Sequence, residues 1–343
     1  MVKRLIRSGG EAALRQLPFS MLRTLASFDL VLPLYHVVSD APLAHAHHLF
    51  CCRDTRAFKE DLDFFLKNYS PLSLNDLIDA LKNEEPIAAK SFLLTFDDGF
   101  REVHDVVAPI LKEKGVPAVF FLCPAFLDNK RLFYRNKASI LVEAVQGKAL
   151  AKTIEREVRG IFLRNGIAFS DFKASMFTVS YHQQDVLDEI ALKLDLDFSE
   201  YLRTQKPYLS SDQVEALKRD GFAIGAHSID HPCYAELSLE EQLGQTIESA
   251  TYVKQRFSLE YGAFAFPFND FGVSRRFFEE ISRSGCIDVS FGSGRGMQED
   301  IVANHLQRFS MEMNSFPAQE TVERFYRGRF MDLLTAALSR CMC

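Results

Sequence analysis

Two short segments, each placed where a run of apolar residues ends, together supply a pair of adjacent carboxylates and two imidazoles. The first segment reads Thr95-Phe96-Asp97-Asp98-Gly99 and the second reads His227-Ser228-Ile229-Asp230-His231. A metal ion that activates water at neutral pH typically needs three protein ligands and one open position for the water. Because the two imidazoles and one of the adjacent carboxylates supply these ligands and the other carboxylate is left over, the segments outline the site of a divalent-metal hydrolase.

The two histidines of the second segment have the spacing of the helical H-E-x-x-H zinc proteases, but not their context. Ser228 follows His227 where those enzymes have a glutamate, so the segment contains no equivalent base. Pro232 directly follows His231 and disfavours the helical conformation there. We therefore expect the pair on a loop at the end of a strand, with a third ligand and a base from elsewhere in the chain.

The adjacent carboxylates of the first segment can supply both missing groups. Asp97 and Asp98 follow a short apolar strand and must point in different directions, so one can bind a metal ion while the other accepts a proton. Gly99 permits a sharp backbone turn after them. The pattern predicts one ligand and one base here without deciding which residue takes which role.

The order of apolar segments predicts the fold that must position these groups. Buried strands without polar alternation are expected over 30–35, 92–96, 117–122, 222–226, 263–266 and 287–291. Segments with helical spacing lie between them, at about 56–68, 74–82, 239–256 and 274–284. This alternation indicates a parallel sheet covered by helices, closed into a β/α barrel, and active sites of such barrels form at the carboxyl ends of the strands.

The chain is expected to divide into a barrel domain with additions. Residues 30–312 form the barrel domain, and a helical insertion interrupts it at about 128–210. Residues 1–29 are predicted to form a basic amphipathic helical segment, and 313–343 a C-terminal helix. A role of the N-terminal segment in membrane contact or partner binding stays open beside simple packing on the domain.

Composition limits the partners and the compartment. The 343 residues carry a formal net charge of −6, so no basic field exists to attract nucleic acid, and none is expected as a partner. The seven cysteines form an odd and clustered set, which favours a reducing compartment. No uninterrupted apolar stretch typical of a signal peptide or a membrane span is present. We expect a cytoplasmic protein, with peripheral attachment to the inner membrane surface as an alternative.

Histidines gather in the loop after the first strand. His36 is expected to be a hydrogen-bonded residue at the strand end, with approach to the site as the alternative. His45, His47 and His48 are expected to form a solvated loop, with metal capture as a second reading.

These motifs, in this order, resemble those of the NodB-homology polysaccharide deacetylases, carbohydrate esterase family 4. The two segments described first resemble the first two family motifs, and Phe264-Ala265-Phe266-Pro267-Phe268 resembles the third. Tyr35-His36 and Leu306-Gln307-Arg308 also resemble segments of family members. The likeness covers roughly residues 30–312 apart from the insertion, and it implies an α/β fold, a distorted (β/α)7-type barrel.

The resemblance implies a role for each site residue. Asp97 would be the catalytic base, while Asp98, His227 and His231 would hold a divalent ion, most simply Zn²⁺, with Co²⁺ or Ni²⁺ as alternatives. The implied reaction removes N-acetyl groups from an N-acetylhexosamine-containing polysaccharide or glycan precursor. Such an N-acetylated glycan would be the partner, and the sequence does not indicate an oligomeric state.

Two departures from the family pattern concern the groups around the base. Many family members have an arginine two residues before the proline of the third motif, where this chain has Ala265. The usual catalytic acid, a histidine late in the domain, has His305 as its nearest candidate. The departures keep two alternatives open: an amidohydrolase of the same fold acting on a small non-sugar amide, and a glycan-binding protein with a degenerate site.

Overall fold

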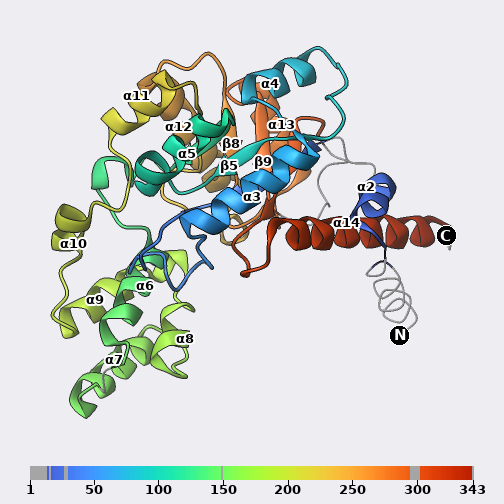
Figure 1. The fold of residues 1–343 in the computed structure, drawn as a ribbon. Coiled ribbons are helices and arrows are strands. Elements are labelled where there is room, and N and C mark those ends of the chain that lie inside the picture. The colour runs from blue at the N-terminus through green and yellow to red at the C-terminus, as the bar shows by residue number, and fades with distance from the viewer. Residues whose placement is uncertain (1–13, 15–16, 27–29, 148–149, 294–301, 342–343) are drawn as a thin grey trace.

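The centre of the molecule is a parallel sheet of eight strands. The computed structural model describes residues 14, 17–26, 30–147, 150–293 and 302–341 (Figure 1). The strands are β2 (Pro33–Tyr35), β5 (Leu94–Phe96), β6 (Ala118–Leu122), β7 (Ala223–Ala226), β8 (Ala263–Ala265), β9 (Val289–Gly292), β10 (His305–Gln307) and β11 (Phe309–Ser310). Nearly all of their residues are buried, which explains why the strands show no polar alternation in the sequence.

The sheet curls into a nearly closed barrel. Its strand order is β10-β9-β8-β7-β6-β5-β2-β11, and all of these pairings are parallel. The first and last strands of this order are separated in the chain by Arg308 alone. If β10 and β11 are taken as one bent strand, the barrel has seven strands, and the predicted (β/α)7-type barrel is confirmed.

Two of the expected strands are each divided between this barrel and a small second sheet. The second sheet has the order β1-β4-β3 and consists of β1 (Leu30–Val31), β4 (Ser91–Phe92) and β3 (Ser70–Pro71). The prediction of continuous strands over 30–35 and 92–96 was therefore wrong in detail. Leu32 and Leu93 are the points where the chain changes sheet, and both are buried, so hydrophobicity alone does not reveal the break.

Helices cover the barrel, and most of them begin at a side-chain cap. They are α3 (Thr55–Asn68), α4 (Leu74–Lys82), α5 (Ala108–Lys114), α11 (Ser211–Arg219), α12 (Leu239–Arg256) and α13 (Arg275–Ser284). Ser238 begins α12 with a capping box in which Glu241 bonds back to the Ser238 backbone. The predicted helices over 56–68, 74–82, 239–256 and 274–284 are confirmed to within a residue.

The segment 128–210 contributes helices with an apolar core of their own. These are α6 (Tyr134–Val145), α7 (Lys152–Arg164), α8 (Phe172–Met176), α9 (Asp185–Lys193) and α10 (Phe198–Gln205). Figure 1 shows α6 to α10 gathered at one side of the barrel. Their buried side chains form a cluster distinct from the barrel core. Ala46 belongs to this cluster and lies in the loop that carries His45, His47 and His48, called the histidine loop below.

The histidine loop is not solvated throughout, contrary to expectation. The His45 side chain is 3% exposed, and its Nδ1 lies 3.0 Å from the Tyr201 hydroxyl of α10. Burial, together with the charge of Arg101, lowers the pKa of His45 to about 4. The loop is thus packed against the insertion.

The helices α2 (Phe19–Ala26) and α14 (Ala318–Cys341) lie side by side. They pack on each other, with the rings of Phe19 and Tyr326 6.2 Å apart (Figure 1). Most of the predicted N-terminal segment 1–29 lies outside the described residues. Within the described part of the chain, no helix is both long and apolar enough to span a bilayer.

Candidate active site

The barrel brings Asp97, Asp98, His227 and His231 together at the carboxyl ends of its strands. Asp97 and Asp98 follow β5, and His227 follows β7. The backbone N–H of Asp97 donates to Tyr35 at 3.0 Å, and that of His227 donates to Leu122 at 2.8 Å. The parallel pairing therefore continues one residue past the strands and fixes the backbone beneath the site.

Asp98, His227 and His231 form a compact group of potential metal ligands. One ligand atom from each residue lies within 4.8 Å of the others. Asp98 Oδ1 lies 3.1 Å from His231 Nε2 and 3.5 Å from His227 Nε2. Within the described residues this buried oxygen accepts no hydrogen bond of good geometry. A buried carboxylate oxygen without a donor, facing two imidazole nitrogens, fits a divalent cation of the zinc type.

A backbone carbonyl orients one of the imidazoles. His227 Nδ1 lies 2.8 Å from the carbonyl oxygen of Ala265, so the proton on Nδ1 is donated to this acceptor. The lone pair of Nε2 is then directed at the carboxylates. Hydrogen bonding of the second ring nitrogen is the common way in which proteins fix the tautomer of a metal-binding histidine.

The loops that carry these ligands contain backbone strain. Asp98, Ser228 and His231 have φ angles of 70°, 63° and 62°, which non-glycine residues adopt at a cost of about 1 kcal/mol each. The Ser228 hydroxyl accepts a hydrogen bond from the His231 N–H at 3.0 Å and stabilises the turn between the histidines. This turn explains why the second motif is not helical despite its four-residue spacing.

The protonation states suit a cation. Burial raises the pKa of Asp98, but the imidazoles of His231, His36 and His227 outweigh burial, and the net pKa is below its usual value. Burial lowers the pKa of His227 to about 4, although Asp97 acts in the opposite direction. At neutral pH the carboxylate is therefore charged and His227 is neutral, which is the state that binds metal.

A buried arginine that the sequence analysis did not assign to the site holds Asp97. Arg308 Nη1 donates to Asp97 Oδ1 at 2.7 Å, and Nη2 donates to Oδ2 at 2.8 Å. Burial raises the pKa of Asp97, but the Arg308 charge, helped by His227, outweighs burial and lowers it overall. Asp97 therefore stays ionised beside the metal ligands, with both oxygens oriented.

Arg308 itself is fixed by the closure of the barrel. It stands between β10 and β11, its backbone N–H donates to Gly292 at 3.0 Å, and its guanidinium lies 5.3 Å from the Phe121 ring centroid. Many family members have an arginine in the third motif, where this chain has Ala265. Arg308 supplies the positive charge from another part of the chain. The only signal in the sequence was the likeness of Leu306-Gln307-Arg308 to a family segment, and this likeness did not indicate a partner.

A second pair, also from opposite ends of the chain, lies beside the carboxylates. His36 follows β2, and its Nδ1 lies 2.6 Å from Glu312 Oε2, while Glu312 also accepts the backbone N–H groups of His36 and Val37. Burial lowers the pKa of His36, but its hydrogen bond to Glu312 and the charges of Glu312, Asp98 and Asp97 raise it overall. The His36 side chain is 15% exposed, so this imidazole with its raised pKa still reaches solvent.

His305, the sequence-based candidate for the acid, lies in a separate buried group. Its Nδ1 lies 2.8 Å from the Ser290 hydroxyl and its Nε2 lies 3.2 Å from Asp270 Oδ2. Gln307 Nε2 donates to the same Asp270 oxygen at 2.8 Å. Within the described part of the chain, no hydrogen bond or ion pair joins His305 to the metal-ligand group. Its role as acid stays a prediction, and the contacts favour His36.

Aromatic side chains surround His231. The rings of Phe133 and Phe268 lie 4.2 Å and 4.7 Å from its imidazole, centroid to centroid. Phe268 is 40% exposed and has a φ of 56°, so a strained turn presents its ring at the surface beside a metal ligand. Tyr181 of the insertion donates to Asp230, the residue before His231, at 2.9 Å. The insertion therefore supports the second motif directly.

The fold resembles that of a solved deacetylase. The deacetylase PplD of Streptococcus pyogenes, solved in complex with acetate, superposes with a TM-score of 0.54 at 15% identity, covering 87% of this chain and 98% of that chain. At this identity the likeness establishes the fold, a NodB-type β/α barrel.

Sequence comparison shows a resemblance to polysaccharide deacetylases. A polysaccharide deacetylase family model matches residues 84–159, which include Asp97 and Asp98. A putative polysaccharide deacetylase of Bacillus subtilis, YheN, is 28% identical over 166 residues, which is 48% of this chain and 52% of that protein. The poly-beta-1,6-N-acetyl-D-glucosamine N-deacetylase of Escherichia coli K12 is 30% identical over 96 residues, which is 28% of this chain and 14% of that protein. The resemblance to polysaccharide deacetylases is thus confirmed, while the chain spans about half of the first curated relative and less of the second.

Proposed function

We propose that this protein is a metal-dependent N-deacetylase of glycans that contain N-acetylhexosamine. The observation that carries the proposal is the geometry of Asp97: a buried carboxylate held bidentately by Arg308 and lying 3.6 Å from the Nε2 of His227. A base beside a metal-ligand group is the arrangement required to hydrolyse an amide with water.

Asp98, His227 and His231 would hold the ion, and Zn²⁺ is the simplest choice for two imidazoles and one carboxylate, with Co²⁺ or Ni²⁺ as alternatives. A divalent ion supplies two effects when bound: it acidifies a water molecule and polarises the acetamide carbonyl. The protein residues then need only to move protons and to orient the substrate.

Asp97 accepts the proton of the attacking water. Arg308 keeps this carboxylate ionised and fixes both oxygens, so the base cannot rotate away from the water. A base with a lowered pKa is weak, which is acceptable here because the water is itself acidified.

His36 is the group best placed to protonate the leaving amine. Glu312 orients its Nδ1 and raises the pKa of the ring, which favours the form with a proton on the opposite ring nitrogen. Transfer of that proton to the amide nitrogen completes cleavage of the C–N bond and releases acetate and a free amine on the sugar.

Poly-N-acetylglucosamine or its precursor is the substrate class we propose. The Escherichia coli relative is named as an N-deacetylase of poly-beta-1,6-N-acetyl-D-glucosamine. The exposed Phe268 ring beside His231 offers an apolar face on which a sugar ring can stack. The activity on N-acetylglucosamine oligomers should increase with chain length, whereas an enzyme for a small non-sugar amide would show no such increase.

A reducing compartment is proposed as the site of action. The described chain has five free cysteines, Cys51, Cys52, Cys123, Cys233 and Cys286. Cell fractionation tests the proposal, and recovery of the protein outside the cell membrane would contradict it.

The direct test of the function is acetate release from N-acetylglucosamine oligomers by metal-free protein supplied with Zn²⁺ or Co²⁺. We expect release by the wild type and almost none by Asp97→Asn. Absence of release in the wild type with a correctly bound ion would favour the glycan-binding alternative.

A further inference from the structure

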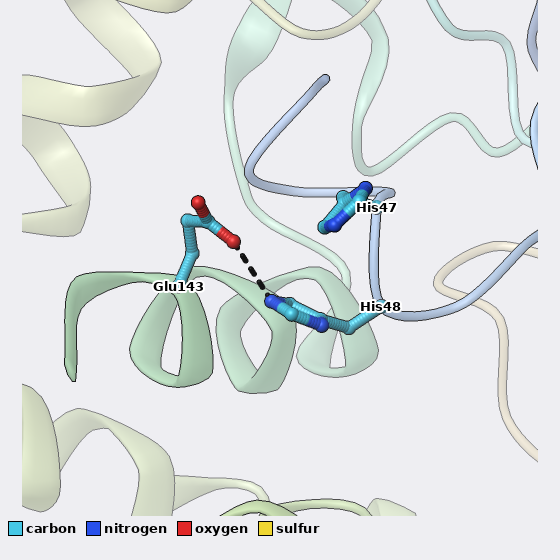
Figure 2. A group of neighbouring side chains, drawn as sticks. All are labelled: His47, His48 and Glu143. Atoms are coloured by element: carbon cyan, nitrogen blue, oxygen red, sulfur yellow. Dashed lines mark hydrogen bonds and ion pairs between the residues drawn. The ribbon is translucent and has the colours of Figure 1, made fainter. Parts of the chain in front are cut away.

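A second group with the same donor types lies apart from the active site. His47, His48 and Glu143 each offer a ligand atom, and these atoms lie within 4.8 Å of one another. Figure 2 shows Glu143 projecting from α6 toward the His48 ring, with His47 beside it on the histidine loop. His48 Nε2 lies 2.8 Å from Glu143 Oε2, and the ring centroids of the two histidines are 4.9 Å apart.

The backbone around this group is held in place by α6. The Ser139 hydroxyl donates to the carbonyl of Ala44 at 2.7 Å, and the Asn136 amide donates to the carbonyl of His45 at 2.8 Å. The turn is also closed internally, since the His47 N–H donates to Leu43 at 2.7 Å. The loop therefore presents its two imidazoles to Glu143 at a fixed position on the helix.

We propose that His47, His48 and Glu143 form a second metal site, which binds a transition-metal dication and fastens the histidine loop to the insertion. Metal bonds to imidazole nitrogen and carboxylate oxygen are about 2.0–2.2 Å long, so donor atoms that share an ion lie roughly 3–4 Å apart. His48 and Glu143 need to separate slightly, and the exposed His47 ring is free to turn toward them.

The donors determine the kind of ion. Two imidazoles and one carboxylate suit Zn²⁺, Ni²⁺ or Cu²⁺, whereas Ca²⁺ and Mg²⁺ prefer oxygen ligands. Lys173 places a positive charge near His48. This charge opposes any cation here, so binding has to come from coordination bonds to the two imidazoles, which Ca²⁺ and Mg²⁺ do not favour.

Phe50 connects the second metal site to the active site. Phe50, two residues after His48, stacks on His36 with ring centroids 3.9 Å apart and an interplanar angle of 16°. His36 is the proposed proton donor, so an ion that fixes the histidine loop also fixes the ring that packs against this imidazole. The role is positional, and the second ion takes no part in the chemistry.

The experiment counts metal ions in a chain that lacks the first site. We would titrate Zn²⁺ into His227→Ala/His231→Ala protein by calorimetry and measure bound zinc after dialysis. One equivalent should bind. Adding Glu143→Gln should weaken this binding at least about tenfold, the scale of losing a group that supports a metal site. Glu155→Gln, at an exposed position on α7 of the same insertion, is the matched control and should change nothing.

A second measurement of bound zinc uses protein in which His227 and His231 are intact. It covers the case in which the double variant does not fold. Wild-type protein should retain two zinc ions, Glu143→Gln one, and Glu155→Gln two. Equal zinc content in the Glu143 and Glu155 variants would overturn the proposal, as would a folded double variant that binds no zinc.

Discussion

The two histidine–carboxylate groups have the same donor types, two imidazoles and one carboxylate, but the protein supports them differently. Asp98, His227 and His231 are at most 4% exposed and lie at the ends of barrel strands. Their counterparts in the second group lie on a loop and on α6, where His47 is exposed and the other two are half-buried. The catalytic group thus derives its geometry from the barrel, and the second group from one loop packed on one helix.

The first group has features beyond its ligands that make it a reactive site. The buried group has a fixed tautomer, strained turns and a second carboxylate ionised by Arg308. The second group has a hydrogen bond between two of its donors and no adjacent base among the described contacts. Breaking the first group should therefore affect chemistry and folding, whereas breaking the second should affect metal content and the position of the histidine loop.

The largest expected effect follows from removing a buried ligand. His227→Ala should lower zinc binding at the first site and reduce acetate release at least about 10³-fold, because both the ion and a neutral buried imidazole are lost. His182→Ala, at an exposed histidine of the insertion, is the control and should retain both properties. Equal rates in the two variants would remove the first group from the reaction.

Loss of the buried arginine should destabilise the barrel. Arg308→Met leaves Asp97 buried without its partner, and we expect the free energy of unfolding to fall by about 3–5 kcal/mol in urea denaturation. Arg283→Met, which breaks an exposed ion pair with Glu280, should change little. Similar losses in both variants would mean that the Arg308–Asp97 pair contributes no more than a surface pair.

The proton donor can be tested by the pH dependence of the rate. A general acid is active while protonated, so acetate release should fall as the pH rises through the raised pKa of His36. His36→Asn should lower the rate about 10²-fold and abolish this fall in rate at alkaline pH. Glu312→Gln should shift the fall in rate to lower pH. If the fall in rate at alkaline pH were unchanged in both variants but absent in His305→Asn, the acid would be His305.

Acid should destabilise the metal-free protein through the first site. The pKa of His227 is about 4 in the folded chain and near 6.5 when unfolded, so between these values only the unfolded state binds the proton. Stability should therefore fall as the pH drops from about 6.5 to 4. Asp97 and Asp98, with lowered pKa values, stabilise the folded state above about pH 4 and lose that contribution at lower pH. If the free energy of unfolding measured with urea stayed constant from pH 7 to 4, the buried, neutral state of His227 would be contradicted.

The smallest effect is expected in the second group. Without metal, Glu143→Gln should change the free energy of unfolding by less than about 1 kcal/mol, because it weakens one partly exposed hydrogen bond. Thermal unfolding with a chelator present would measure it. A loss as large as that of Arg308→Met would show that the second group is part of the folding core.

The sequence allowed the barrel and the strand ends to be predicted because both depend on local patterns. The apolar runs located the strands, and the motifs at their ends located Asp97, Asp98, His227 and His231. The helices over 239–256 and 274–284 were predicted from their helical spacing, and in the structure a serine cap begins each one.

The groups that complete the site could not be predicted, because their partners are far apart in the chain. Arg308 meets Asp97 across 211 residues, and His36 meets Glu312 across 276. Such pairs depend on closure of the barrel between β11 and β2, which no local pattern encodes. His45 was misassigned for the same reason, since its burial depends on Tyr201 of the insertion.

The central claim is that Asp97 is the base beside an ion held by Asp98, His227 and His231. The most direct measurement compares wild type and Asp97→Asn for bound zinc and for acetate release from N-acetylglucosamine oligomers at the same pH. Our account predicts that the variant keeps its zinc and loses about 10²–10⁴-fold in rate, the contribution of a positioned base. Equal rates at equal zinc content would contradict it.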